Sequence, residues 1–202
     1  MVASTRPDTR THLVNTATHL FLDKSYGTIS TSKICEEASV NKGTFYHFFP
    51  SKASLLIAAM DKYTQALIAE LITLSNSDLS PEAKITGIFK IPAMCNEAFK
   101  QAEGKVKGCL IGNIALELST VDSEICQATL RNLDELRAAS QPIVQTFIES
   151  ENLALNAVTA AEHLMALIQG GLVMAKVRND ANAVENLGKT APAALRALAT
   201  VA

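Results

Sequence analysis

Residues 30–52 read STSKICEEASVNKGTFYHFFPSK, and this stretch decides the fold of the chain. Ser30 suits the N-cap of a short helix, and Asn41 suits the N-cap of a second helix over about residues 42–48. Between them, Ser39-Val40-Asn41 predicts a break of about three residues. Two short helices joined by such a turn form a helix-turn-helix, a motif whose second helix can enter the major groove of DNA.

The apolar residues of this stretch are expected to fix the angle between the two helices. They are Ile34, Ala38, Val40, Phe45 and Phe48, while Cys35 is expected to face inward and Phe49 to belong to the core. The second helix then exposes a polar set that can meet DNA, namely Lys42, Gly43, Thr44, Tyr46 and His47. Lys42 supplies charge, Gly43 lets a backbone approach closely, and the other three offer hydrogen bonds.

Two alternatives stay open at the borders of the motif. Ser30, Thr31 and Ser32 either contact phosphate or act only as helix caps. Lys52 either contacts phosphate or is an ordinary solvated lysine.

Helical periodicity continues on both sides, and strong strand signals are missing, so the sequence predicts an all-α fold. Asp8 can cap a preceding helix that ends at Gly27. Later helices are expected from about Ser51, from Pro81 to Gly104, and over about residues 109–118, 122–149, 156–178 and 182–200. Prolines 92, 142 and 192 lie inside three of them and predict a break or a bend.

Composition narrows the class of protein. With 202 residues, 48% apolar and 19% charged, the chain can build a core and is not disordered. No apolar run approaches the roughly 18 residues of a membrane span, and the start carries no apolar signal, so we expect a cytoplasmic protein with no membrane partner. Four widely spaced cysteines and the lack of metal or nucleotide motifs predict no disulfide framework, no metal site and no cofactor.

Charge is distributed unevenly. Residues 1–55 hold six Lys or Arg against four acids, whereas the remainder holds 12 basic and 16 acidic residues. This asymmetry favours an anion-facing N-terminal part on a mildly acidic body.

The motif resembles the N-terminal signature of the TetR family of transcriptional regulators. The match covers residues 10–56 and includes Lys-Gly-Thr-Phe-Tyr-x-x-Phe from Lys42 and the later Ser51-Lys52 pair. The resemblance implies an all-α homodimer on a palindromic DNA operator, with a three-helix DNA-binding domain at residues 1–50 and a larger helical ligand and dimer domain at residues 51–202. Ser39 departs from the glycine that the family often has there, so a serine must hold the turn.

A second constellation lies in the body, where residues 107–118 read KGCLIGNIALEL. Cys109 starts a short helix, a position whose free N–H groups favour a thiolate. The segment, with a later Ala-Lys pair, resembles the electrophile- and redox-responsive NemR-like group, which implies sensor roles for Cys109 and Lys176. Two alternatives remain, an inert core cysteine and a solvated lysine.

We therefore expect a DNA-binding repressor, not an enzyme, released by a small-molecule inducer or by an electrophile or oxidant. One alternative is an all-α enzyme that consumes electrophiles through Cys109 without binding DNA, for which only His163 and carboxylates could serve as partners in the body. Another is an interaction module that does not bind DNA.

Overall fold

The computed structural model describes residues 8–200, and within that range all regular elements are helices. They are α1 (Thr9–Asp23), the short 3-10 helix η1 (Tyr26–Thr28), α2 (Thr31–Glu37), α3 (Lys42–Phe48), α4 (Lys52–Ser75), α5 (Pro81–Glu103), α6 (Leu110–Leu118), α7 (Ser123–Ser150), α8 (Ala157–Arg178) and α9 (Asn182–Ala199). The predicted all-α fold is confirmed.

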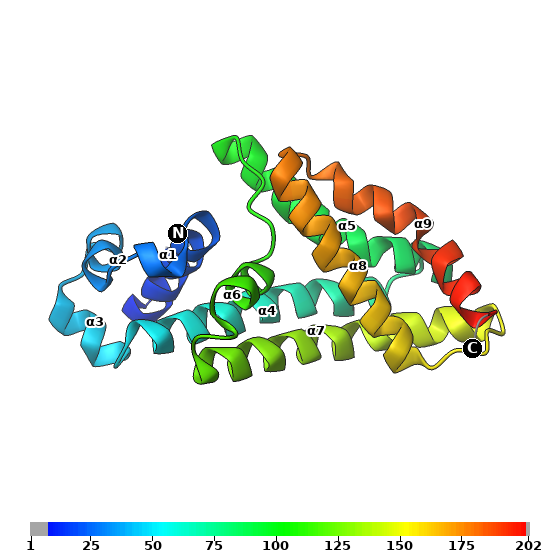
Figure 1. The fold of residues 1–202 in the computed structure, drawn as a ribbon, viewed down its shortest axis with the longest axis horizontal. Helices are drawn as coiled ribbons and strands as arrows, with labels where there is room; N and C mark the ends of the chain where they lie inside the picture. Colours follow the sequence, from blue (N-terminus) through cyan, green and yellow to red (C-terminus); the bar gives the residue numbers. More distant parts are fainter. Residues whose placement is uncertain (1–7, 201–202) are drawn as a thin grey trace, which may run out of the picture.

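The molecule is elongated, with α1, α2 and α3 at one end and α4 running from them into the remaining helices (Figure 1). We call α1–α3 the head and α4–α9 the tail. In the tail α5 packs on α9, α4 on α7, and α8 on both α7 and α9, while α1 packs on α4. Because α4 belongs to both packings, it joins the head to the tail.

Side-chain caps begin α1, α2, α3 and α4 where the sequence predicts them. Asp8, Ser30, Asn41 and Ser51 each accept a hydrogen bond from a backbone N–H of the first turn that follows. Such caps each contribute about 1 kcal/mol, and they fix where the short helices start.

Of two predictions about where helices end, one is confirmed and one is wrong. Ser39 adopts φ of 52°, in the left-handed region, as the predicted turn requires. Gly27, in contrast, does not end α1, because the helix already ends at Asp23, where Lys24 turns extended and its N–H bonds to the Leu20 carbonyl. That prediction was wrong, and Gly27 lies instead in η1.

The three internal prolines do not break their helices. α5, α7 and α9 run continuously through Pro92, Pro142 and Pro192, so a break at Pro92 or Pro192 is ruled out, whereas a kink at Pro92 and a bend at Pro142 stay predictions. Packing outweighs the lost backbone hydrogen bond, since α5 and α9 bury residues on both sides of these positions.

The glycine pair of α8 serves two purposes. A Cβ at Gly171 would lie 2.7 Å from Leu187 Cδ1, so this glycine permits the close packing of α8 on α9. A Cβ at Gly170 would meet nothing within 4 Å, so Gly170 lies on the open face of α8.

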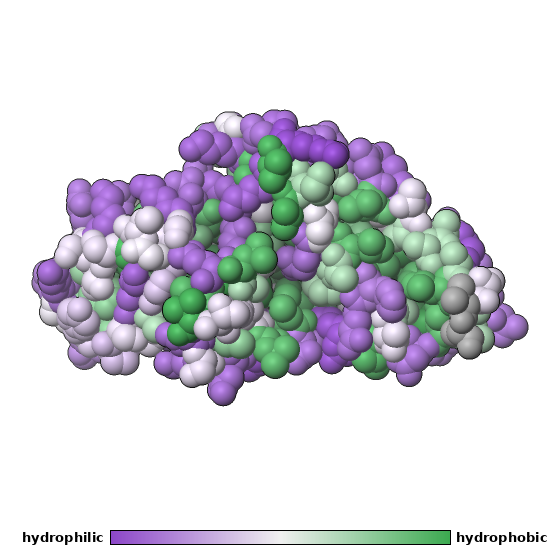
Figure 2. Space-filling model, in the orientation of Figure 1, coloured by the Kyte–Doolittle hydropathy of each residue, from purple (hydrophilic) through white to green (hydrophobic). Residues whose placement is uncertain are grey.

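α8 is also the one helix among residues 8–200 whose length and hydropathy would suit a membrane span. This is weak evidence for a membrane, because its buried side packs against α7 and α9 as a core helix does. Hydrophobic residues nevertheless gather on the face that carries α6 and α8 (Figure 2).

Candidate nucleic-acid interface and inner cavity

A rigid base supports the surface of α3. Ile34, Ala38, Phe45 and Phe49 are each at most 3% exposed and form the core between α2, α3 and their neighbours. Burying one large apolar side chain stabilises the fold by about 1.5–3 kcal/mol, so the angle between α2 and α3 is well fixed.

The predicted contact face of α3 points outward. Lys42, Gly43, Tyr46 and His47 are exposed and Thr44 is half-buried. Tyr46 remains 54% exposed although its ring lies edge-on to Phe45, with 5.1 Å between the ring centroids. An exposed phenol braced by a buried ring is well placed to contact an external partner.

At the start of α2 a serine caps the helix, and the charge of a lysine is compensated by two glutamates. Ser30 Oγ accepts a hydrogen bond from the Lys33 N–H at 3.1 Å, so Ser30 acts as the cap, and Thr31 and Ser32 lie beside it at the surface. Lys33 pairs with Glu36 and Glu37 at 3.2 and 2.8 Å. The hydrogen bond to Glu37, followed by that to Glu36, raises the pKa of Lys33. The phosphate contact of residues 30–32 stays a prediction.

Lys52 takes a position that sequence reasoning did not anticipate. Its Nζ donates to the carbonyl oxygens of Tyr26 at 2.9 Å and Ile29 at 2.8 Å, and it lies 3.8 Å from the centroid of the Tyr26 ring. Burial lowers the pKa of Lys52, while the charge of Glu117 opposes this effect. A phosphate contact by Lys52, still a prediction, would have to use the remaining N–H of its ammonium group.

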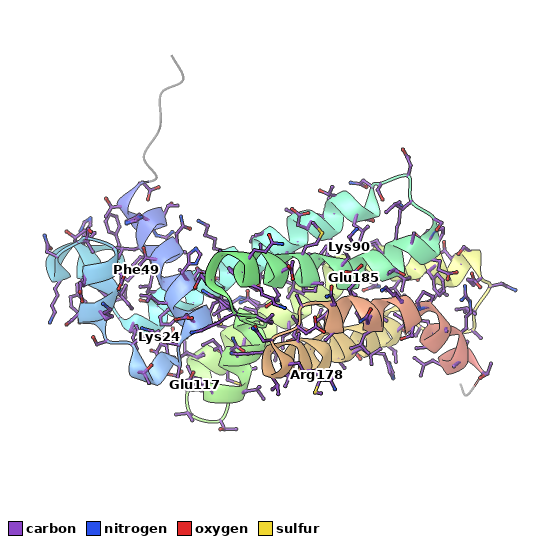
Figure 3. The ribbon with its side chains drawn as sticks, turned by 90° about the horizontal axis from the view of Figure 1, so that it is seen from above. Lys24, Phe49, Lys90, Glu117, Arg178 and Glu185 are labelled. Carbon is purple, nitrogen blue, oxygen red and sulfur yellow. The ribbon has the colours of Figure 1, made fainter. Side chains whose placement is uncertain are left out.

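Glu117, at the end of α6, is a functional candidate that sequence reasoning missed. Its carboxylate accepts hydrogen bonds from the Ser25 hydroxyl, from the Tyr26 N–H at 3.0 Å and from the Gly27 N–H at 2.9 Å. Burial by itself would raise the pKa of Glu117, but these hydrogen bonds outweigh it and hold the pKa below its ordinary value. Figure 3 places Glu117 at the junction of head and tail, near Lys24.

An apolar cavity of about 40 Å³ lies between α4, α5, α7 and α8, and we call it the inner cavity. Its lining comprises Tyr63, Leu67, Leu71, Ile88, Ile91, Pro92, Cys109, Leu136, Ser140, Met165, Ile168, Gln169 and Leu172. The lining contains no Asp, Glu, Lys, Arg or His side chain. Burial, and then the neighbouring thiols of Cys109 and Cys95, raise the pKa of Tyr63 well above its ordinary value, so its hydroxyl stays neutral.

A second hollow of about 160 Å³ opens between α6 and α8, and we call it the outer groove. Cys109 and Lys176 both line it, so the structure brings together the two residues predicted as the sensor. Cys109 is the N-cap of α6 and is 5% exposed. Lys176 Nζ donates to Asn113 Oδ1 at 3.1 Å, which holds the lysine over the first turn of α6.

The loop before Cys109 is fixed by buried polar groups. Asn96 Oδ1 accepts from the N–H groups of Lys107 and Gly108 at 3.0 and 2.8 Å. Lys107 is 4% exposed and pairs with Glu103 at 2.6 Å, so its charge is already compensated. Within residues 8–200 no group of three or more His, Cys, Asp or Glu is arranged to hold a metal ion.

Comparisons with known proteins agree with this architecture. A family model described as bacterial regulatory proteins, tetR family, matches residues 13–59, and a tetracyclin repressor-like C-terminal domain model matches residues 87–191. An uncharacterised HTH-type transcriptional regulator of Lactococcus lactis is 26% identical over 185 residues, covering 89% of both chains. The HTH-type transcriptional repressor NemR of Escherichia coli is 25% identical over 186 residues, covering 90% of this chain and 91% of NemR. The crystal structure of reduced Escherichia coli NemR superposes with a TM-score of 0.74 at 23% identity, covering 94% of this chain and 96% of that chain.

Proposed function

The chain belongs to the TetR family of bacterial regulatory proteins, and we propose that it is a sequence-specific DNA-binding repressor whose tail responds to a small ligand, an electrophile or an oxidant. The observation that carries the proposal is the exposed polar face of α3 on a capped helix-turn-helix. The enzyme alternative has no support among the relatives, which are described as transcriptional regulators.

In the proposed complex α3 enters the major groove. Lys42, Thr44, Tyr46 and His47 meet base edges and phosphates, while the missing side chain of Gly43 permits close approach. Ser30, Thr31 and Ser32 at the start of α2, and Lys52 at the start of α4, lie beside the phosphates and set the orientation of the head.

Regulators of this family act as dimers, and the open face of α8 is our candidate for the contact between two copies. Six of the eight exposed residues of α8 from position 166 onward are apolar or glycine, namely Ala166, Leu167, Gly170, Val173, Met174 and Val177, and the other two are Lys176 and Arg178. Pairing this face sets the distance between two heads, which must reach successive major grooves about 34 Å apart on a palindromic operator.

Regulation follows from the position of α6. Its first residues lie beside Cys109 and Lys176, and its last turn carries Glu117, which binds η1 of the head. Occupation of the inner cavity, or modification of Cys109, would shift α6 and thereby η1. A coupling of about 1–3 kcal/mol changes operator affinity about 5- to 150-fold, enough to release a repressor in the cytoplasm.

Selection of bound fragments from the host genome by the purified protein tests the proposal. We expect enrichment of a palindromic sequence, and we expect Tyr46→Ala to abolish this enrichment. Lys189→Ala on α9 of the tail is the control, because it changes an exposed residue far from α3 along the molecule (Figure 1). Failure of the unmodified protein to enrich any sequence at low salt would refute the DNA-binding function.

A further inference from the structure

The open face of α8 is arranged symmetrically about Gly170. Exposed residues lie three, four and seven positions before Gly170 and at the same intervals after it, namely His163, Ala166, Leu167, Val173, Met174 and Val177. A face with this symmetry can pair with its own copy running in the opposite direction, because each position then meets an equivalent one.

The centre of this face allows two backbones to approach closely. Gly170 and Ala166 carry the smallest side chains on it, and a Cβ at Gly170 would meet nothing within 4 Å in this chain. Larger apolar side chains stand on either side of the centre, with Leu167 39% exposed before it and Met174 44% exposed after it. Two copies crossed at Gly170 would bury these side chains against each other, and removal of apolar surface from water favours association.

One flank of the same face carries charges near its two ends. This flank is followed in steps of four and three residues by Glu162, Ala166, Gln169, Val173 and Lys176. Its last three residues line the outer groove. Glu162 and Lys176 are both exposed, and within residues 8–200 neither of them forms an ion pair. The flank therefore offers an unpaired negative charge before Gly170 and an unpaired positive charge after it.

The direction of pairing decides what these charges meet. When a two-fold axis relates two antiparallel α8 helices, each flank runs beside its own copy in reverse, so Glu162 comes level with Lys176 of the partner subunit. In a parallel pair the two residues stay 14 positions apart along the helix, a separation of about 21 Å at 1.5 Å per residue. Only the antiparallel pair brings opposite charges together, and it does so twice in one dimer.

Lys176 retains hydrogen-bond donors for such a contact. Its Nζ donates to Asn113 Oδ1 at 3.1 Å, which uses one of the three N–H bonds of the ammonium group. A carboxylate of the second copy would accept one of the remaining two. Because Lys176 lines the outer groove, this carboxylate would lie at the rim of the groove, which would then be built from both copies.

We propose that a second copy of this chain pairs its α8 antiparallel to this one across Gly170, and that Glu162 of the partner subunit completes the outer groove by binding Lys176. The inference rests on the proposed function, because it specifies the dimer on which that function depends. It adds a carboxylate from the other copy to the groove that contains Cys109.

Charge reversal tests the predicted register. The dissociation constant of the dimer is measured without DNA, by fluorescence-detected sedimentation velocity of protein labelled at its N-terminus in 0.15 M salt. Glu162→Lys should raise this constant about tenfold, because it places like charges together at two points of the dimer, and Lys176→Glu should do the same. The two changes combined should restore the wild-type value to within about threefold, which a variant that merely misfolds would not do.

Three further variants locate the contact. Glu162→Lys combined with Arg178→Glu is the matched control, because Arg178 lies on the opposite flank of α8 and its reversal should not restore pairing. Glu70→Lys reverses an exposed carboxylate on α4 and should leave the dissociation constant unchanged. Gly170→Arg has room within one chain, but two such side chains at the crossing point would collide and repel, so we expect the constant to rise at least about a hundredfold.

Lack of restoration in Glu162→Lys/Lys176→Glu would overturn the proposal, as would equal restoration by the Arg178→Glu control. An unchanged dissociation constant in Gly170→Arg, or a wild-type protein that stays monomeric at micromolar concentration, would overturn it as well. These measurements contain no DNA, so they are independent of the fragment selection. Enrichment of a palindrome without restoration counts against the pairing alone, whereas restoration without enrichment counts against the DNA-binding function.

Discussion

Replacing Glu117 with glutamine tests whether α6 is coupled to the head. The change keeps the size of the side chain but removes the charge that accepts hydrogen bonds from Ser25, Tyr26 and Gly27. A hydrogen bond to a charged group contributes about 1.5–3 kcal/mol and a neutral one about 0.5–1.5 kcal/mol. The glutamine oxygen keeps part of the set, and water screens this half-buried site, so we expect η1 to lose about 1 kcal/mol of local stability.

Amide hydrogen exchange measures this loss where it occurs. A change of about 1 kcal/mol should make the N–H groups of Tyr26 and Gly27 exchange about fivefold faster at neutral pH. Glu70→Gln on α4 is the control, because it removes an equally sized carboxylate from an exposed surface of the tail. If the N–H group of Tyr26 exchanges as slowly in Glu117→Gln as in the control, Glu117 does not stabilise η1 and the reasoning is refuted.

The same variant predicts a pH dependence with a definite sign. The pKa of Glu117 is lowered in the folded protein, so its stabilisation is present above its ordinary value of 4.5 and is lost as the pH falls through the lowered value. The difference in exchange between wild type and Glu117→Gln should therefore be constant near neutral pH and shrink in acid below about pH 4.5. A difference that grows in acid would contradict this reasoning.

The proposed coupling of α6 to the head also predicts that Glu117→Gln changes regulation. If α6 moves η1 through Glu117, the variant should still bind the operator but release it less on induction. The ratio of operator affinities with and without inducer is the measured quantity, and a coupling of about 1–3 kcal/mol sets its size in the wild type. Full release by Glu117→Gln would show that the signal reaches the head by another route, of which α4 is the first candidate.

Three further predictions concern the remaining candidate residues. Cys109→Ser should abolish derepression by quinones, aldehydes or hypochlorite in a reporter strain and leave operator binding intact; an unchanged response would leave a reversible ligand as the inducer. Lys176→Ala should slow alkylation of Cys109 at neutral pH if its amine stabilises the thiolate, and an unaltered rate removes Lys176 from the sensor. Lys42→Ala should reduce the slope of log affinity against log salt by about one per head, measured by fluorescence anisotropy, whereas a pure base-reading role would leave the slope as it is.

Local chemistry explains which parts of the fold could be predicted. Capping is an interaction between residues two or three apart, so Ser30, Asn41 and Ser51 indicated their helix starts without any knowledge of the tertiary structure. The prolines are the counterexample. Pro92 removes one backbone hydrogen bond, yet packing against α9 and the bond from the Asn96 amide to the Pro92 carbonyl hold α5 in one piece.

The candidate site, too, has parts that the sequence predicts and parts that it does not. The outward face of α3 follows from helical periodicity, whereas the ties between elements do not. Glu117 lies 90 residues or more from its partners Ser25, Tyr26 and Gly27, and Lys52 lies 26 residues from Tyr26. Glu117 belongs to the segment of residues 107–118 that the sequence analysis singles out, but only the folded structure shows which groups its carboxylate contacts.

Together, the long-range contacts of Glu117 and Lys52 hold η1 from two sides. Glu117 binds N–H groups at the start of η1, and Lys52 binds carbonyl oxygens at Tyr26 and Ile29, so each charge faces the end of η1 that its sign favours. The two charges also act on each other, since Glu117 opposes the burial that lowers the pKa of Lys52. Because one residue begins α4 and the other ends α6, the tail holds the segment before α2 from two sides. In the mechanism that we propose, a shift of α6 would move the Glu117 contact and leave the Lys52 contact in place, so η1 would turn and carry the displacement near Cys109 to the helices that follow.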